Sequence, residues 1–121
     1  MALEIRIDKS DARATKVFLS GGLTLGPQLR QFNRQMEGLF SGGAPRAIFL
    51  DFANVRMIDS AGLGELVILY TSAGQHNCRV CLLQAPSSVV RLLEVTRLDG
   101  ILRNFTDAES AGEWLERGNA H

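Results

Sequence analysis

Ser60 is the residue of this sequence best placed for chemistry, because a short segment presents it between an apolar run and a helical pattern. That segment reads Asp59-Ser60-Ala61-Gly62-Leu63-Gly64. Aspartate and serine both favour the N-cap of a helix, so we expect the helix to begin at one of the two. From spacing alone, a purely structural cap is the alternative to a functional role for Ser60.

The two glycines of the segment favour the functional interpretation. Each glycine in the first turns of a helix costs up to roughly 1 kcal/mol relative to alanine. Close approach by another surface would explain this cost. We therefore expect Gly62 and Gly64 to serve partner contact more than folding, and Ser60 to be presented on bare backbone.

The chain lacks the other residues that serine chemistry on a small molecule requires. A nucleophile elbow around Ser60 needs a glycine two residues earlier, where the sequence has Ile58. A Ser-His-Asp triad needs a histidine, and the two in the chain are His76, in a polar turn, and the terminal His121. The sequence has no phosphate-binding loop or dinucleotide-binding glycine pattern. We predict a protein that is not an enzyme and has no cofactor.

Cys78 and Cys81 form a C-x-x-C pair, which invites a redox or metal-binding interpretation. Residues three apart on a strand point to opposite faces, and residues 79–83 have the composition of a buried strand. The sequence has no second cysteine pair to complete a tetrahedral zinc site. We predict two reduced structural cysteines and no metal site.

The elements that position Ser60 are a buried strand and an amphipathic helix. Residues 47–52 form an apolar run typical of a strand buried on both faces, and Asn54 is expected to end it. The apolar residues after Ser60 recur at the spacing of one helical stripe, which comprises Leu63, Leu66, Val67 and Tyr70.

Ile68 and Leu69 lie outside this stripe. Either a neighbouring helix covers one of them, or one belongs to an exposed apolar patch beside Ser60 that suits a partner protein. We favour the patch.

Elsewhere the pattern alternates between strands and helices. Strands are predicted over residues 3–8, 16–20, 79–84 and 101–105, and helices over 27–40, from 85–87 onward and over 107–117. The glycine-rich residues 21–26 are expected to form a loop. The order predicts an α/β fold with a mixed, mostly parallel sheet of about five strands and about four helices.

Length and charge restrict the class of protein. The chain has 121 residues, enough for one domain over 1–121 with its own core. Lys plus Arg and Asp plus Glu both number 13, so no net charge draws it to nucleic acid or to a membrane surface. The sequence shows no signal-peptide pattern and no run of membrane-spanning length, so we expect a cytoplasmic protein.

The segment from Asp59 to Gly64 resembles the D-S-[SA]-G-L-G signature of anti-sigma factor antagonists of the STAS domain family. The resemblance extends over most of the chain and implies the STAS fold. In that family a partner kinase phosphorylates the serine that follows the aspartate, which here is Ser60. Asp59 would then order the loop for kinase recognition, act as a helix cap, or do both. The resemblance implies a partner-binding set that comprises Asp59, Ser60, Ala61, Gly62, Leu63, Gly64, Glu65, Ile68 and Thr24.

One departure from the family concerns the second strand. Many members have an acidic pair in G-E-[IL]-D at this point, where this chain has Gly21-Gly22-Leu23-Thr24. Contacts that those carboxylates would make to a partner are absent. Ala61 replaces a second hydroxyl residue common in the family, which leaves Ser60 as the only hydroxyl of the segment.

The function implied by the resemblance is that of an anti-sigma factor antagonist. The unphosphorylated form would bind an anti-sigma factor with serine kinase activity and release its sigma factor. Phosphorylation of Ser60 would end the binding, and a serine phosphatase would restore it. The alternative is a STAS-domain subunit of a larger assembly, of the lipid-transport or stressosome type, in which Ser60 is structural.

Overall fold

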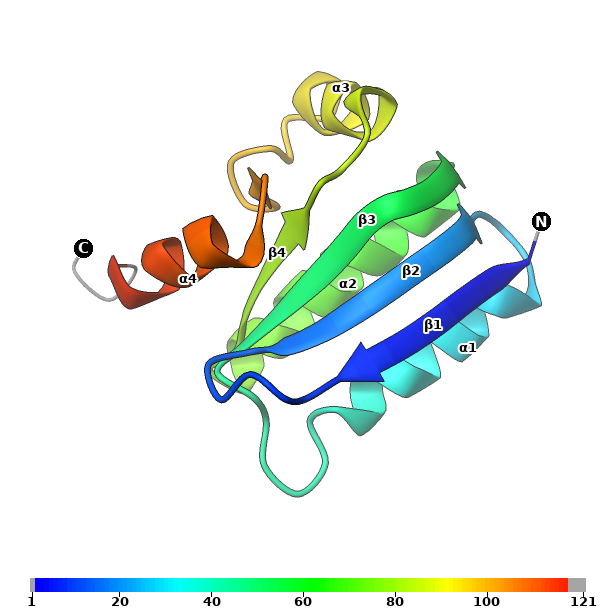
Figure 1. Cartoon of the computed structure of the whole chain (residues 1–121). Coiled ribbons are helices and arrows are strands. Elements are labelled where there is room, and N and C mark those ends of the chain that lie inside the picture. The colour runs from blue at the N-terminus through cyan, green and yellow to red at the C-terminus, as the bar shows by residue number, and fades with distance from the viewer. Residues whose placement is uncertain (1, 118–121) are drawn as a thin grey trace.

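The computed structural model describes residues 2–117, which form a five-stranded sheet with four helices (Figure 1). The strands lie in the order β1-β2-β3-β4-β5; β1 is antiparallel to β2 and the other pairs are parallel. The strands are β1 Leu3–Asp8, β2 Thr15–Leu23, β3 Ala47–Ile58, β4 Arg79–Leu83 and β5 Asn104–Phe105. The helices are α1 Pro27–Gly38, α2 Ser60–Gln75, α3 Ser87–Val95 and α4 Ala108–Arg117. The predicted mixed, mostly parallel α/β fold is confirmed.

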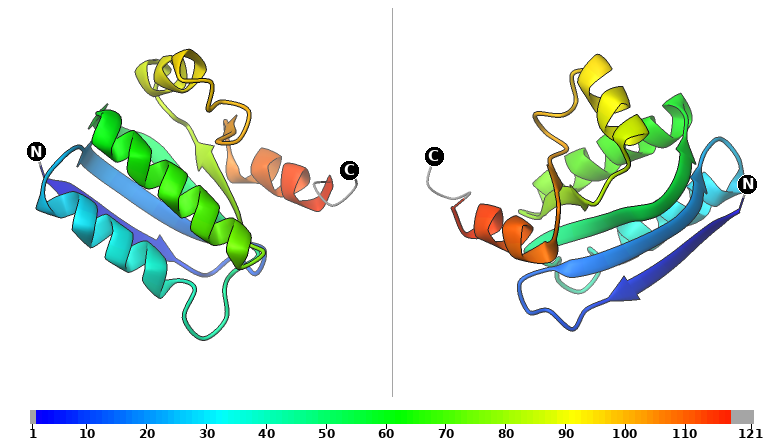
Figure 2. Two further views of the ribbon diagram at one scale, coloured as in Figure 1. Left: turned by 180° about the vertical axis from the view of Figure 1, so that it is seen from behind. Right: turned by 45° about the horizontal axis from the view of Figure 1, so that its top comes forward.

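The core lies on both faces of the central strand β3. Ile48, Leu50 and Phe52 belong to a large apolar cluster that includes residues of α1, α2 and α3, whereas Ala47 and Phe49 pack with α4. Figure 2 shows α1 and α2 side by side across one face of the sheet and α4 at its other side. A strand buried on both faces needs no polar alternation, which is why residues 47–52 are almost uniformly apolar.

Two strands run further than the sequence predicts. β3 continues through Asn54 to Ile58, and β2 continues through Gly21 and Gly22 to Leu23, the first half of the segment that was expected to form a loop. The expected ends of both strands are therefore wrong. The ladder between β2 and β3 continues with two irregularities, between Phe18 and Ser20 and between Gly21 and Gly22. Such bulges accommodate residues that break a regular pattern, so pairing with a neighbour, not side-chain type, sets the length of these strands.

The last strand is shorter than predicted. β5 comprises only Asn104–Phe105, because residues 98–102 form a turn instead. In that turn the Ile101 and Leu102 amides donate to the Leu98 carbonyl at 3.1 and 2.9 Å. The prediction of a strand over 101–105 is wrong at its beginning.

Cys78 and Cys81 lie on opposite faces of the sheet, as predicted. Cys78 belongs to the cluster on the α2 side and Cys81 to the cluster on the α4 side. Burial raises the pKa of both thiols to about 12. Each therefore packs as a small apolar side chain.

None of the helices within residues 2–117 combines the length and the apolar character needed to cross a membrane.

Candidate partner-binding site at the start of α2

Asp59, not Ser60, caps α2. Its Oδ1 accepts a hydrogen bond from the Gly62 amide at 2.9 Å, and its carbonyl accepts the first helical bond, from Leu63, at 2.9 Å. Ser60 is the first residue of the helix and is exposed to solvent. Within residues 2–117 its hydroxyl has no hydrogen-bond partner. The interpretation of Ser60 as a structural cap is therefore wrong.

The second carboxylate oxygen of Asp59 connects the helix to the loop that follows β2. Oδ2 accepts a hydrogen bond from the Leu25 amide at 2.9 Å, and the Asp59 amide donates to the Leu23 carbonyl at 3.4 Å. Donation from Leu25 and then from Gly62 keeps the pKa of this carboxyl below its usual value, because both bonds stabilise the charged form. Asp59 therefore orders the loop and caps the helix at the same time.

The two glycines of the segment have different environments. Gly62 is buried, and a methyl group there would collide with the carbonyl oxygen of Leu23 and lie 2.8 Å from its carbonyl carbon. The expectation that Gly62 serves a partner more than the fold is wrong, because the backbone of β2 already occupies the space beside it. At Gly64 no atom lies within 4 Å of an added methyl group. The role of Gly64 in partner contact stays a prediction.

The buried stripe of α2 is rotated from the predicted one. Leu63 and Leu66 are buried as predicted, but Tyr70 is 37% exposed and Leu69 takes its place in the core at 4%. Ile68 is 49% exposed, so it is the one available to a partner. Residues four apart share a helix face, which puts Ser60, Gly64 and Ile68 in one line on the solvent side.

Ala61, Thr24 and Glu65 are less available than their place in the predicted partner-binding set suggests. Ala61 is half-buried against the core. The Gln28 side-chain amide donates to the hydroxyl of Thr24 at 3.1 Å, which holds Thr24 to the start of α1. Glu65 accepts from Asn33 at 3.4 Å and connects α2 to α1.

Two exposed apolar residues at the ends of β2 and β3 were not predicted from the sequence. Leu25 is 79% exposed and bonded through its amide to Asp59, and Met57 is 55% exposed two residues before that aspartate. The sequence does contain a signal for the exposure of Leu25: it is an apolar residue in a loop, and Gly26 and Pro27 follow it directly. The exposure of Met57 follows from the extension of β3. Ile58 packs against the core on the α2 side, so its neighbour Met57 points to the opposite face of the sheet.

No group of three or more His, Cys, Asp or Glu side chains within residues 2–117 is placed to hold a metal ion.

The chain belongs to the STAS domain family, whose model matches residues 10–111. Solved structures share the fold over nearly the whole chain. The protein TM1081 of Thermotoga maritima is 23% identical, with a TM-score of 0.79 and 95% of each chain covered. An anti-sigma factor antagonist from Mycobacterium paratuberculosis is 16% identical, with a TM-score of 0.77 and 95% of each chain covered. The Bacillus anti-sigma factor antagonist SpoIIAA, in its unphosphorylated form, is 17% identical, with a TM-score of 0.69 and 98% and 100% of the chains covered.

Proposed function

We propose that this protein is an anti-sigma factor antagonist controlled by phosphorylation of Ser60. In the cytoplasm, its unphosphorylated form binds an anti-sigma factor that is also a serine kinase, and the sigma factor is released. The kinase then transfers a phosphoryl group to Ser60, and a serine phosphatase removes it. In this scheme the protein is a substrate and a switch, not an enzyme.

The observation that carries the proposal is the position of Ser60. It is exposed at the first position of α2, and Asp59 performs the capping that would otherwise occupy its hydroxyl. A kinase needs such a hydroxyl, accessible and without a competing intramolecular bond. SpoIIAA has been solved in both an unphosphorylated and a phosphorylated form, so the fold accommodates the modification in that protein.

The proposed partner surface comprises Ser60, Gly64 and Ile68 on α2, with Leu25 in the loop that Asp59 holds beside the helix start; we call it the Ser60 surface. Its two large apolar side chains, Leu25 and Ile68, are 79% and 49% exposed and could both be buried by a partner protein. Gly64 lets another backbone approach the helix closely, because its surroundings are open. Serine in the middle of such a surface is well placed to control binding.

Phosphorylation would act at the interface. A phosphate adds about −1.5 to −2 charges at neutral pH. At the helix start it gains roughly 0.3–1 kcal/mol from the free amides and the helix dipole, and the adjacent Asp59 carboxylate opposes this. In a bound complex, an unpaired buried charge costs on the order of 2–5 kcal/mol. That energy corresponds to a loss of affinity of roughly thirty-fold to a few thousand-fold.

The experiment compares wild type, Ser60→Ala and Ser60→Asp as immobilised baits in extract of the source organism, with and without Mg-ATP. Ser87→Ala is the matched control, because Ser87 is also an exposed serine at the first position of a helix. Without ATP, wild type, Ser60→Ala and Ser87→Ala should retain the same serine kinase, and Ser60→Asp should not. With Mg-ATP, wild type and Ser87→Ala should gain one phosphoryl group at Ser60 and lose the kinase, while Ser60→Ala keeps it.

Phosphorylation at another residue, or retention of the kinase by the phosphorylated protein, would contradict the proposal. Equal recovery of one large stable complex by Ser60→Ala and Ser60→Asp would instead support the alternative, a subunit of a larger assembly.

A further inference from the structure

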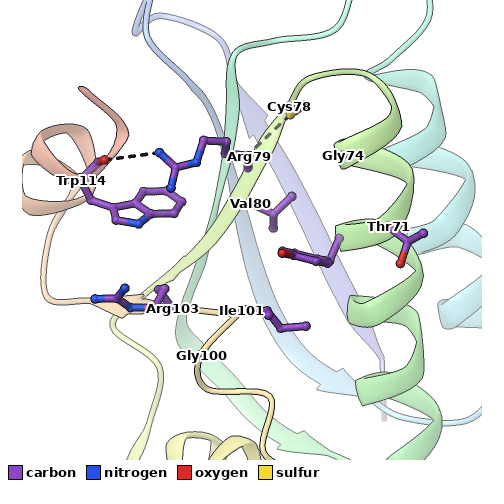
Figure 3. Close-up of a pocket in the computed structure, with 10 residues that line it drawn as sticks. Thr71, Gly74, Cys78, Arg79, Val80, Gly100, Ile101, Arg103 and Trp114 are labelled. Atoms are coloured by element: carbon purple, nitrogen blue, oxygen red, sulfur yellow. Dashed lines mark hydrogen bonds between the residues drawn. The ribbon is translucent and has the colours of Figure 1, made fainter. Parts of the chain in front are cut away.

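A hollow of about 470 Å³ lies at the other end of α2 from Ser60 (Figure 3). Tyr70 on its wall is ten residues beyond Ser60, about 15 Å along the helix axis at the usual rise per residue. The hollow is bounded by α2, the first half of β4, the turn before β5, and α4. Its volume is in the range of sites that bind small molecules.

The hollow exists because β5 is too short to cover β4. β5 pairs only with Leu82 and Leu83. The Arg79 amide donates toward β3, to the Arg46 carbonyl at 3.0 Å, and the Leu82 amide donates to the opposite side, to the Arg103 carbonyl at 2.7 Å. Successive amides of a strand point to alternate edges, so the Val80 amide faces the same side as that of Leu82. Within residues 2–117 no strand pairs with Val80 there, which leaves a backbone donor at the hollow.

Two arginines give the hollow a positive charge. The guanidinium of Arg79 lies 3.7 Å from the centre of the Trp114 ring, and its Nη1 donates to the Trp114 and Leu115 carbonyls at 3.4 Å. These contacts hold Arg79 at the α4 side of the hollow, as Figure 3 shows. Arg103 also lines the hollow. Within residues 2–117 neither arginine forms an ion pair, and no carboxylate lines the hollow.

The remaining wall is aromatic and apolar. The chain has one tryptophan and one tyrosine, and both Trp114 and Tyr70 line this hollow together with Ile101. Tyr70 and Ile101 are each 37% exposed, although both are large and apolar. An exposed ring, an exposed aliphatic side chain and two cations in one concave site are the features that recognise a ring bearing an anionic group.

We propose that this hollow is a binding site for a small organic anion with an aromatic or apolar body. Arg103, Arg79 and the Val80 amide bind the anionic group, whether sulfonate, carboxylate or phosphate. Trp114, Tyr70 and Ile101 contact the body of the ligand. The site is separate from the Ser60 surface and does not depend on its proposed function.

The test is a titration followed by ¹⁵N NMR with three probes. Naphthalene-1-sulfonate carries both the ring and the charge, naphthalene-1-sulfonamide has nearly the same shape without the charge, and inorganic sulfate carries the charge alone. The indole N–H of Trp114 is a site-specific reporter because it is the only tryptophan in the chain. The sulfonate should shift this resonance and that of the Val80 amide. The sulfonamide and sulfate should each bind at least about tenfold more weakly, because the first lacks the charge and the second lacks the ring.

Arg103→Gln should weaken sulfonate binding about tenfold, as expected for loss of a charge-assisted hydrogen bond. Arg34→Gln is the matched control, an equal charge change at an exposed position on α1, and should bind like wild type. Equal binding of sulfonate and sulfonamide, equal binding of sulfate alone, or an unchanged affinity in Arg103→Gln would each overturn the proposal.

Discussion

Gly62 and Gly64 are two residues apart in one helix turn, and the structure predicts opposite effects when each is replaced by alanine. At Gly62 the added methyl group would collide with the Leu23 carbonyl. That carbonyl belongs to backbone and cannot rotate away, so the start of α2 would have to move from β2. Such a movement also disturbs the hydrogen bond from the Asp59 amide to Leu23.

Overpacking of a tight contact costs typically about 1–3 kcal/mol. For a domain of this size, such a loss lowers the melting temperature by about 3–15 °C. At Gly64 the added methyl group meets open space, and alanine is better than glycine in a helix by up to about 1 kcal/mol. Gly64→Ala should therefore melt at or slightly above the temperature of wild type and still bind its partner more weakly.

Thermal and urea unfolding, followed by circular dichroism, measure the stability of the two variants. Partner retention on immobilised Gly64→Ala measures the expected loss of binding. Wild-type stability in Gly62→Ala would refute the inference that the approach of Leu23 requires glycine. Unfolding of Gly64→Ala would show that this glycine has a backbone role, and it would remove Gly64 from the Ser60 surface.

Three further predictions concern the same helix. Ile68→Asp should reduce partner retention while leaving the melting temperature within a few degrees, whereas Leu69→Asp places a charge in the core and should unfold the domain. A large loss of stability in Ile68→Asp would contradict the placement of Ile68 on the Ser60 surface. Phosphorylation of Ser60 should leave amide hydrogen exchange along α2 close to that of the unmodified protein, because attraction of the phosphate to the helix start is offset by repulsion from the Asp59 carboxylate. Faster exchange along α2 after phosphorylation would show a conformational switch instead. Asp59→Asn should keep the cap but lose the bond from the Leu25 amide, because an amide nitrogen cannot accept it. The folded-state pKa of Asp59 is lowered, so its stabilisation is present above the unfolded pKa of about 3.9 and is lost as pH falls through the folded value. Urea unfolding from neutral to acid pH should therefore show the difference between wild type and Asp59→Asn shrinking below about pH 4, and a pH-independent difference would count against this role.

The sequence by itself determined the α/β order of elements, the buried central strand and the position of Ser60 at a helix start. These follow from local signals: an unbroken apolar run, a change of period to that of a helix, and capping residues between them. Asp59 and Ser60 are equally good caps in isolation, so their roles could not be separated from residue type. Donors from two segments, the Leu25 and Gly62 amides, orient the Asp59 carboxylate and decide which residue is the cap.

Only the tertiary structure decided what depends on residues distant in the sequence. The space beside Gly62 is filled by Leu23 of another strand, whereas that beside Gly64 is open, although the two glycines read alike. Tyr70 fits the predicted helical stripe and Leu69 lies outside it, yet Tyr70 faces the hollow left by the short β5 and Leu69 packs in the core. Local pattern specifies which residues can form a helix or a strand, while burial of each side chain depends on which neighbours the fold brings against it.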